Sequence, residues 1–318
     1  MVGQESWTLD RQVPEGMSLE VADMVGLLEG ALRAAVATES VALLVEQMRW
    51  QRARLETLDL THLDAAVTDR AVWLASDAAS PERLRELLTL AIGSHHPAPV
   101  DGPLELSPLA RQFLEHVVGA DRHAAVATIM DAADHGVSMD ELLVEVIEAT
   151  QFEVGRLWER GEISVAQEHT CTAIVQLALA ALYPRLLSSM PHRPSVVAVV
   201  AGRFAHEVGL RIVLDLLEGA GWRTTFLGSG LEVSDVVDQV VRHDAAIVAL
   251  SAAIAADVGA VSDLIGALRT DPRTAQVRII VGGRVFRTDP TLAERVGADG
   301  YARDAREAVQ LCDSLLGG

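Results

Sequence analysis

The sequence contains no lysine, so all 26 of its basic residues are arginines. This absence excludes mechanisms that need a lysine amine, such as Schiff-base catalysis and the phosphate-binding loop of nucleotide hydrolases. No apolar run approaches the ~20 residues that span a bilayer, and the first residues lack the basic-then-apolar pattern of a signal peptide. We therefore expect a soluble, cytoplasmic protein that makes no contact with a membrane.

Cysteine and positive charge are also scarce. The two cysteines, Cys171 and Cys312, lack the spacing of a metal or redox motif, which suits a reducing cytoplasm. The formal net charge is −19, and residues 1–100 alone carry 8 arginines against 15 acidic residues. Affinity for DNA depends on neutralising its phosphates, so we expect no direct DNA binding.

The first half of the chain has the pattern of helices. Residues 1–95 repeat apolar residues at three- and four-residue steps and predict a helical region of unknown role. Residues 93–105 contain Pro, Gly and polar residues, which is typical of a linker. Residues 107–190 predict a bundle of four helices, the last of which opens with a capping box between Ser164 and Gln167.

From residue 195 the period of the pattern changes. Short β-branched runs alternate with helical stretches, which predicts a parallel α/β sheet over residues 195–318. Five strands favour the flavodoxin-like order, in which ligands bind outside the carboxyl ends of strands 1 and 3. The predicted fold class is therefore multidomain, with helical regions followed by a five-stranded, flavodoxin-like α/β domain.

The loops at that edge do not match the usual nucleotide or phosphate sites. No G-x-G-x-x-G follows the first strand, and the third strand ends in Ser251 instead of the aspartate of a phospho-receiver domain. His206 and Gly209 follow the first strand, and Gly282 and Gly283 follow the fourth. These small residues leave a slot along the sheet edge for an extended ligand tail. A lone histidine is more often structural, but its place among these residues favours a ligand.

This set of residues resembles the cobalamin-binding domain over residues 195–318. The family pattern is acid-x-His-x-x-Gly, a Ser after strand 3 and Gly-Gly after strand 4. The resemblance implies that His206 ligates cobalt from below and that the cofactor's nucleotide tail passes the Ser and the glycines. One position departs, because Phe204 stands where the family has the acid that orients a metal-bound imidazole.

A second group of residues lies ahead of that domain. Trp158 closes one predicted helix, and Glu168 and His169 open the next. Alone, these residues would be a core Trp beside two solvated polar side chains. Ahead of a cobalamin domain, they resemble the cap of CarH-type adenosylcobalamin light sensors. The resemblance implies that the Trp and the acid contact the adenosyl group, whereas Glu159 replaces the His that captures cobalt in the best-known members.

We therefore predict a light-responsive cobalamin sensor that is not an enzyme. It would bind adenosylcobalamin between cap and sheet and would act through an unknown protein partner or a change of homo-oligomer. Two alternatives stay open. One is a corrinoid carrier subunit of a methyltransferase, which has the same layout of bundle and sheet. The other is a photoreceptor that binds a bilin beside cobalamin, as the related photocobilins do.

Overall fold

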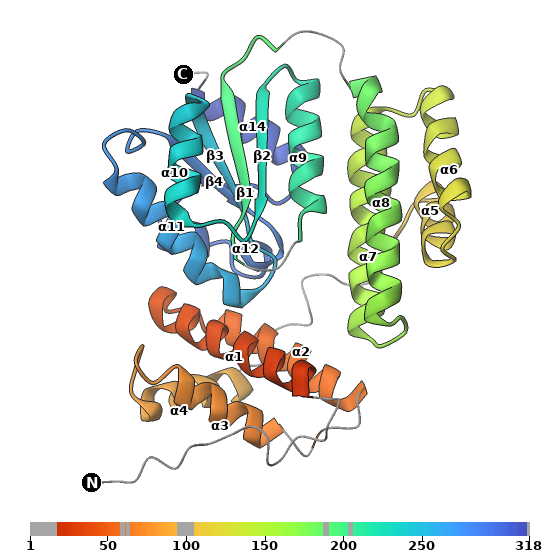
Figure 1. The fold of residues 1–318 in the computed structure, drawn as a ribbon. Helices are drawn as coiled ribbons and strands as arrows, with labels where there is room; N and C mark the ends of the chain where they lie inside the picture. The colour runs from red at the N-terminus through yellow and green to blue at the C-terminus, as the bar shows by residue number, and fades with distance from the viewer. Residues whose placement is uncertain are drawn as a thin grey trace.

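The structure is a computed structural model that describes residues 18–57, 61, 64–93, 105–186, 191–202 and 206–316. Phe204 and residues 94–104 of the predicted linker lie outside the described residues. Three groups of elements follow one another along the chain and are shown in Figure 1. The exact limits of the predicted domains stay a prediction.

The first group consists of four helices that pack against one another. They are α1 (Ser18–Thr38), α2 (Val41–Thr57), α3 (Asp64–Leu74) and α4 (Pro81–Gly93). Ser80 precedes α4 and accepts a hydrogen bond from the amide of Arg83, so it caps this helix. Met24, Val25, Leu55 and Val67 form a small buried core among the first three helices. These helices therefore hold together as a unit, which we call the N-terminal unit.

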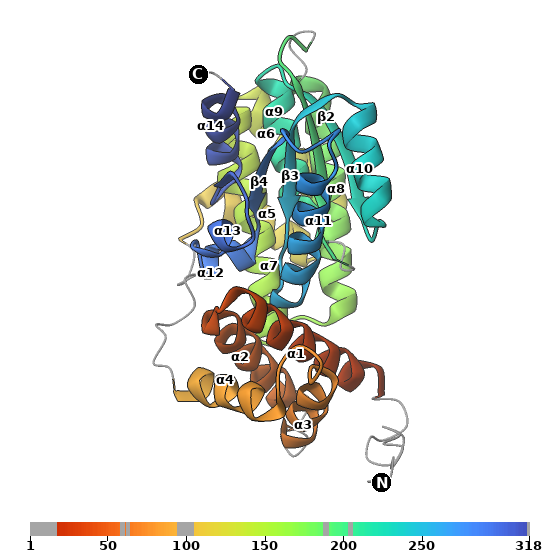
Figure 2. The ribbon, with the colours of Figure 1, turned by 90° about the vertical axis from the view of Figure 1, so that its left-hand side faces the viewer.

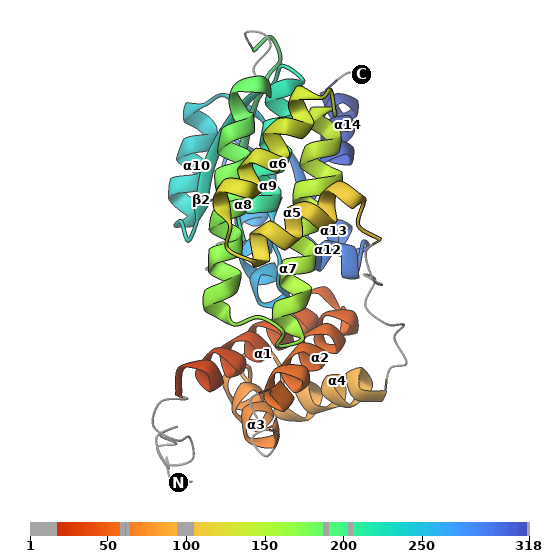
Figure 3. The ribbon, with the colours of Figure 1, turned by 90° about the vertical axis from the view of Figure 1, so that its right-hand side faces the viewer.

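The second group is a helical cap that lies beside the sheet (Figure 3). Its elements are α5 (Pro108–Val118), α6 (Arg122–Asp134), the π-helix η3 (Glu141–Glu148), α7 (Ala149–Glu159) and α8 (Val165–Leu186). Gln167 donates its amide N–H to Ser164 Oγ at 3.2 Å, and Ser164 donates its own to Gln167 Oε1 at 2.9 Å. This reciprocal pair confirms the predicted capping box. The four-helix bundle is also confirmed, except that its third helix begins as a π-helix.

The third group is a parallel sheet of five strands in the order β2-β1-β3-β4-β5. The strands are β1 (Ser195–Val200), β2 (Arg223–Ser229), β3 (Ala245–Ser251), β4 (Arg278–Gly282) and β5 (Gly300–Tyr301). The six residues of β1 are all buried, because both faces of a doubly wound sheet are covered. This order is the flavodoxin-like one, so the predicted fold class is confirmed.

Helices cover the two faces of the sheet (Figure 2). One face packs on α9 (Val208–Gly219) and α14 (Ala305–Leu316), and the other packs on α10 (Val233–Arg242) and α11 (Val258–Thr270). Three short helices lie in the loops between strands. They are η4 (Ala255–Asp257), α12 (Arg284–Thr288) and α13 (Leu292–Arg295).

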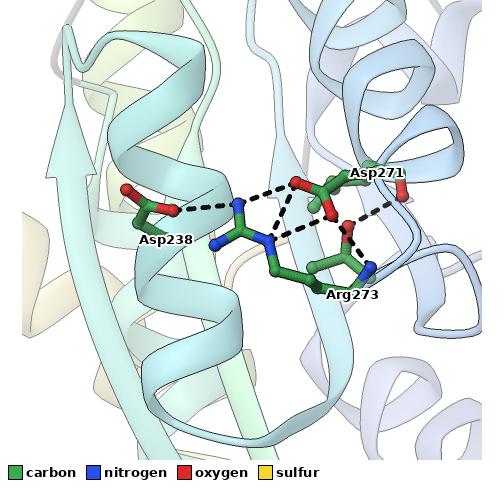
Figure 4. Close-up of polar contacts among 5 residues, drawn as sticks. Asp238, Asp271 and Arg273 are labelled. Carbon is green, nitrogen blue, oxygen red and sulfur yellow. Dashed lines mark hydrogen bonds and ion pairs between the residues drawn. The ribbon is translucent and has the colours of Figure 1, made fainter.

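An arginine joins α10 to the turn that follows α11. The guanidinium of Arg273 lies 2.7 Å from a carboxylate oxygen of Asp271 and 3.0 Å from one of Asp238. Figure 4 shows how these three side chains lie. The hydrogen bonds from Arg273 lower the pKa of Asp271. The turn precedes β4, at the amino end of that strand. This cluster therefore orders the side of the sheet opposite the strands' carboxyl ends.

Both helical groups contact the α/β unit. On the cap side, α8 packs along α9, and Arg306 of α14 pairs with Asp140 and, at 2.8 Å, with Glu145. The N-terminal unit lies across the carboxyl ends of the strands, where α1 contacts η4 and α2 contacts both α12 and α7 (Figures 1 and 3). Within the described ranges, no helix has both the length and the apolar character needed to cross a membrane.

Candidate functional site

The carboxyl ends of β1, β3 and β4 meet at one point of the sheet. Ser251 ends β3 and is in register with Val200 of β1 on one side and with Gly282 of β4 on the other. His206 and Gly209 follow β1, at the start of α9. The fold therefore brings the predicted residues of the α/β domain to the same edge, which is where ligands bind in this fold.

His206 stands where the chain enters α9. The residue is exposed to solvent by area, and desolvation lowers the pKa of its imidazole. Glu168 of the cap acts in the opposite direction, and Arg284 of α12 adds to the lowering. The ring is therefore neutral near pH 7, which is the form that ligates a metal. The charges of Glu168 and Arg284 thus both act on this ring.

The three glycines at this edge differ in how much room their surroundings leave for a side chain. Gly283 has a φ of 95°, and a Cβ built there would lie 2.3 Å from the carbonyl oxygen of Ala252, so only glycine fits. A Cβ on Gly282 would lie 3.3 Å from the carbonyl oxygen of Ala302. A Cβ on Gly209 would meet nothing within 4 Å. Packing therefore requires glycine at position 283 and leaves the surface beside Gly209 open.

The predicted corner of the cap is only partly assembled. Trp158 is half-buried at the end of α7, and none of the described residues accepts a hydrogen bond from its indole N–H. Glu168 is also half-buried; it accepts a hydrogen bond from Thr172 at 2.8 Å and lies 2.8 Å from His169 Nδ1. The imidazole of His169 is 75% exposed and projects from the cap surface. Trp158 and Glu168 are thus held toward the interior, whereas His169 is not.

Several residues at this corner were not predicted. The ring of Trp50, on α2, lies 5.9 Å from that of Trp158 between centroids. Arg284 of α12 pairs with Glu159 of the cap and, at 3.1 Å, with Glu46 of α2. The only sequence signal for this contact is that Arg284 follows the predicted glycine pair. Glu159, predicted near the cofactor, is therefore engaged by an arginine.

Taken together, these residues define a class of protein. A flavodoxin-like sheet carries His206 at its carboxyl edge, and a helical cap packs against the same α/β unit. Family models agree with this description. A B12 binding domain model matches residues 194–310, and a second, also described as a B12 binding domain, matches residues 109–183. The chain is therefore a cobalamin-binding domain protein.

The chain is similar to proteins that are named as corrinoid proteins. Dimethylamine corrinoid protein 3 of Methanosarcina acetivorans is 23% identical over 214 residues, which make up 67% of this chain and 99% of the relative. Dimethylamine corrinoid protein 1 of the same organism is 27% identical over 212 residues, or 64% of this chain and 98% of the relative. Both relatives are named as corrinoid proteins, which agrees with the prediction that the chain is not itself an enzyme.

A solved structure shows the same fold. The monomethylamine corrinoid protein of Methanosarcina barkeri matches with a TM-score of 0.58 at 21% identity, covering 64% of this chain and 96% of that one. About a third of the present chain has no counterpart in these proteins. Both family models begin at residue 109 or later, so the N-terminal unit precedes them.

The prediction of a light sensor is wrong. The two relatives from Methanosarcina acetivorans are named as dimethylamine corrinoid proteins, and that finding overturns the prediction. The structure shows a physical reason for the error. Trp158 packs on Trp50, and Glu159 pairs with Arg284, so partners within the chain account for two residues of the corner. Residue types at a given spacing did not identify the group that they contact.

The residues at the carboxyl edge fit a corrinoid. The imidazole of His206 is a suitable cobalt ligand, and the surface at Gly209 is open, because a Cβ there would meet nothing within 4 Å. His206 would hold the metal, and the edge beside Ser251 would hold the ligand tail. His206, Gly209 and Ser251 all lie within the residues that the B12 binding domain model matches.

A buried carboxyl group lies between the cap and the α/β unit. Glu148 ends η3, and none of the described residues gives its Oε2 atom a hydrogen bond. Burial, followed by the negative charge of Asp304, raises its pKa to about 7, and Arg287 and Arg306 offset only part of this shift. The folded protein therefore keeps a proton on Glu148 that the unfolded chain releases near pH 4.5.

Because the folded pKa is the higher one, this group makes the free energy of unfolding fall as the pH rises from about 4.5 to about 7. Glu148→Gln removes the charge, so it should stabilise the protein at pH 8 by on the order of 1–3 kcal/mol and make little difference at pH 4.5. Urea unfolding at both values measures this. Glu141→Gln, at an exposed position of the same helix, is the control. A gain that does not depend on pH would contradict the assignment.

Proposed function

We propose that the protein is a corrinoid carrier, which holds a cobalamin between its cap and the carboxyl edge of its sheet and presents it to a methyltransferase. The observation that carries this proposal is the likeness to dimethylamine corrinoid proteins over almost their whole length, through both the cap and the sheet. The unknown protein partner expected from the sequence would then be a methyltransferase.

Each residue of the site has a role in this proposal. When bound, the corrinoid supplies a cobalt atom that accepts a methyl group and gives it up. His206 would bind the metal from the sheet side with its neutral imidazole. Ser251 and the two glycines would border the ligand tail. Trp158, at the end of α7, would exclude water from the bound cofactor.

The same proposal also predicts which group the cobalt of the bound cofactor would carry. A carrier holds a methyl group there, where the sequence predicted an adenosyl group. The comparisons support cobalamin itself, and both the adenosyl group and a bilin stay untested predictions. The cytoplasmic location and a homo-oligomeric state likewise stay predictions.

Methyl transfer tests the proposal directly. The protein is loaded with methylcobalamin carrying a labelled methyl group and is mixed with a thiol acceptor and a corrinoid-dependent methyltransferase of a methylamine system. We expect the thiol to gain the label faster than it does with free methylcobalamin at the same concentration, because a carrier positions its cofactor for the enzyme. Free methylcobalamin also proves that the enzyme is active. If the active enzyme uses the free cofactor and leaves the protein-bound methyl group in place, the protein is not a carrier for this class of enzyme.

A further inference from the structure

The N-terminal unit packs against the carboxyl edge of the sheet, which forms part of the proposed cobalamin site. Helix α1 packs on η4, which follows the strand that ends in Ser251. A Cβ built on Gly30 of α1 would lie 2.6 Å from the Cβ of Ala256 and 2.8 Å from its Cα. The two backbones are therefore in direct contact, and no ligand passes between them while α1 is in this place.

The same turn supports the loop that carries the candidate cobalt ligand. Asp257, next to the contact with α1, is buried, and its carboxylate lies against the backbone of Gly202. A Cβ on Gly202 would be 1.9 Å from Asp257 Oδ1. Gly202 belongs to the segment between β1 and His206. The contact between α1 and η4 is thus linked, through the side chain of Asp257, to the segment that leads to His206.

Helix α2 connects the cap to the carboxyl edge. Trp50 packs on Trp158 of the cap, and Glu46 pairs with Arg284 after β4. Arg284 also pairs with Glu159, so one guanidinium joins the N-terminal unit, the cap and the edge. Figures 1 and 3 show α1 and α2 lying across both the ends of the strands and the end of α7.

We propose that the N-terminal unit is a lid over the cobalamin site, which must move aside for the cofactor to enter and for a partner enzyme to reach it. The inference rests on the site of the proposed function and adds a regulated entrance to it. It follows from the position of α1 and α2 between cap and edge, and from their absence in relatives that are matched over almost their whole length. Those relatives have no counterpart of this barrier.

The junction of α1 and α2 offers a place to lock the lid. Ser40 is buried there and donates its hydroxyl to Asp289 Oδ2, 2.6 Å away, in the segment after α12. Cysteines at these two positions would replace side chains that are already in hydrogen-bond contact, so the pair is a candidate for a disulfide. The natural cysteines, Cys171 and Cys312, are both buried, so they do not compete for the oxidant.

The test compares the oxidised and reduced forms of the full-length Ser40→Cys/Asp289→Cys protein. Uptake of hydroxocobalamin is followed by its absorption spectrum, and thiol counting verifies the disulfide. We expect the oxidised form to take up the cofactor at least about 10-fold more slowly, since closing the lid removes the competent population, and reduction to restore the rate. The Ser40→Cys protein should not respond to oxidant.

Equal rates in the two forms would overturn the lid and leave the site intact. A protein that takes up no cobalamin in either form, when the wild type does so, has lost its fold through the substitutions, and Glu46→Gln then decides. That change weakens the contact with Arg284 and should speed uptake severalfold, whereas Glu56→Gln, at an exposed position of the same helix, should not. A wild-type rate for Glu46→Gln would then overturn the proposal. A wild-type protein that binds no cobalamin would overturn the site and the lid together.

Discussion

Replacing His206 with alanine should weaken the binding of hydroxocobalamin by at least about 100-fold, because loss of even a partner of a metal ligand costs 10- to 100-fold in affinity. The absorption spectrum of a histidine-ligated cobalt should disappear with it. The structure supports this expectation because His206 lies at the carboxyl edge, between β1 and α9. Cobalamin titration followed by absorbance measures both effects.

A matched control separates ligation from a general loss of histidine. His135 lies at the end of α6, exposed, and its Nδ1 atom is 2.7 Å from the carbonyl oxygen of Asp131. His135→Ala should bind cobalamin with the affinity and the spectrum of the wild type. If His206→Ala kept both, the cobalt would have another lower ligand, and the segment after β1 would have only a structural role.

The α/β domain was predictable because its signals are local. The change of period at residue 195 and the separation of the strands determine a parallel sheet, and connections in such sheets follow few topologies. The predicted residues then meet at one edge, because strands ending in Ser251 and Gly282 are adjacent and parallel. The capping box at Ser164 was equally local, since its two partners are three residues apart.

The cap and the N-terminal unit were predictable only in part. No signal distinguished the π-helix Glu141–Glu148 from an α-helix, because both show the same apolar stripe. The seat of α1 and α2 depends on contacts between residues far apart in the sequence, such as Ser40 with Asp289 and Glu46 with Arg284. The spacing of apolar residues along the sequence carries no information about such pairs.

The wrong prediction of function has the same origin. Trp158, Glu168 and His169 were interpreted as walls around a light-sensitive ligand because of their types and spacing. In the structure the indole packs on Trp50, a residue 108 positions earlier in the chain. An aromatic side chain at the end of a cap helix serves equally to bind a cofactor or to seat another helix. Only the fold and the relatives distinguish the two uses.

Gly30→Ala should lift α1 from the turn after β3, whereas Gly26→Ala in the same helix should not. Both changes replace a helical glycine, so each gains about 1 kcal/mol of intrinsic helix stability. At Gly26 the new Cβ meets nothing within 4 Å, and the full gain is expected. At Gly30 it would lie 2.6 Å from the Cβ of Ala256, and the backbone atom at 2.8 Å cannot turn away as a long side chain could.

Overpacking of this kind costs about 1–3 kcal/mol, so the gain at Gly30 is cancelled or reversed and the two variants should differ by that amount in thermal unfolding. Hydrogen exchange gives the more specific measurement. Amides of η4 and of the facing part of α1 should exchange faster in Gly30→Ala alone, because a lifted helix exposes both surfaces. Cobalamin uptake should accelerate in the same variant, since the seat of the lid is weakened. If the amides of η4 stay protected in Gly30→Ala and cobalamin uptake is unchanged, α1 is a fixed part of the structure. That result would exclude the proposal that the N-terminal unit is a lid.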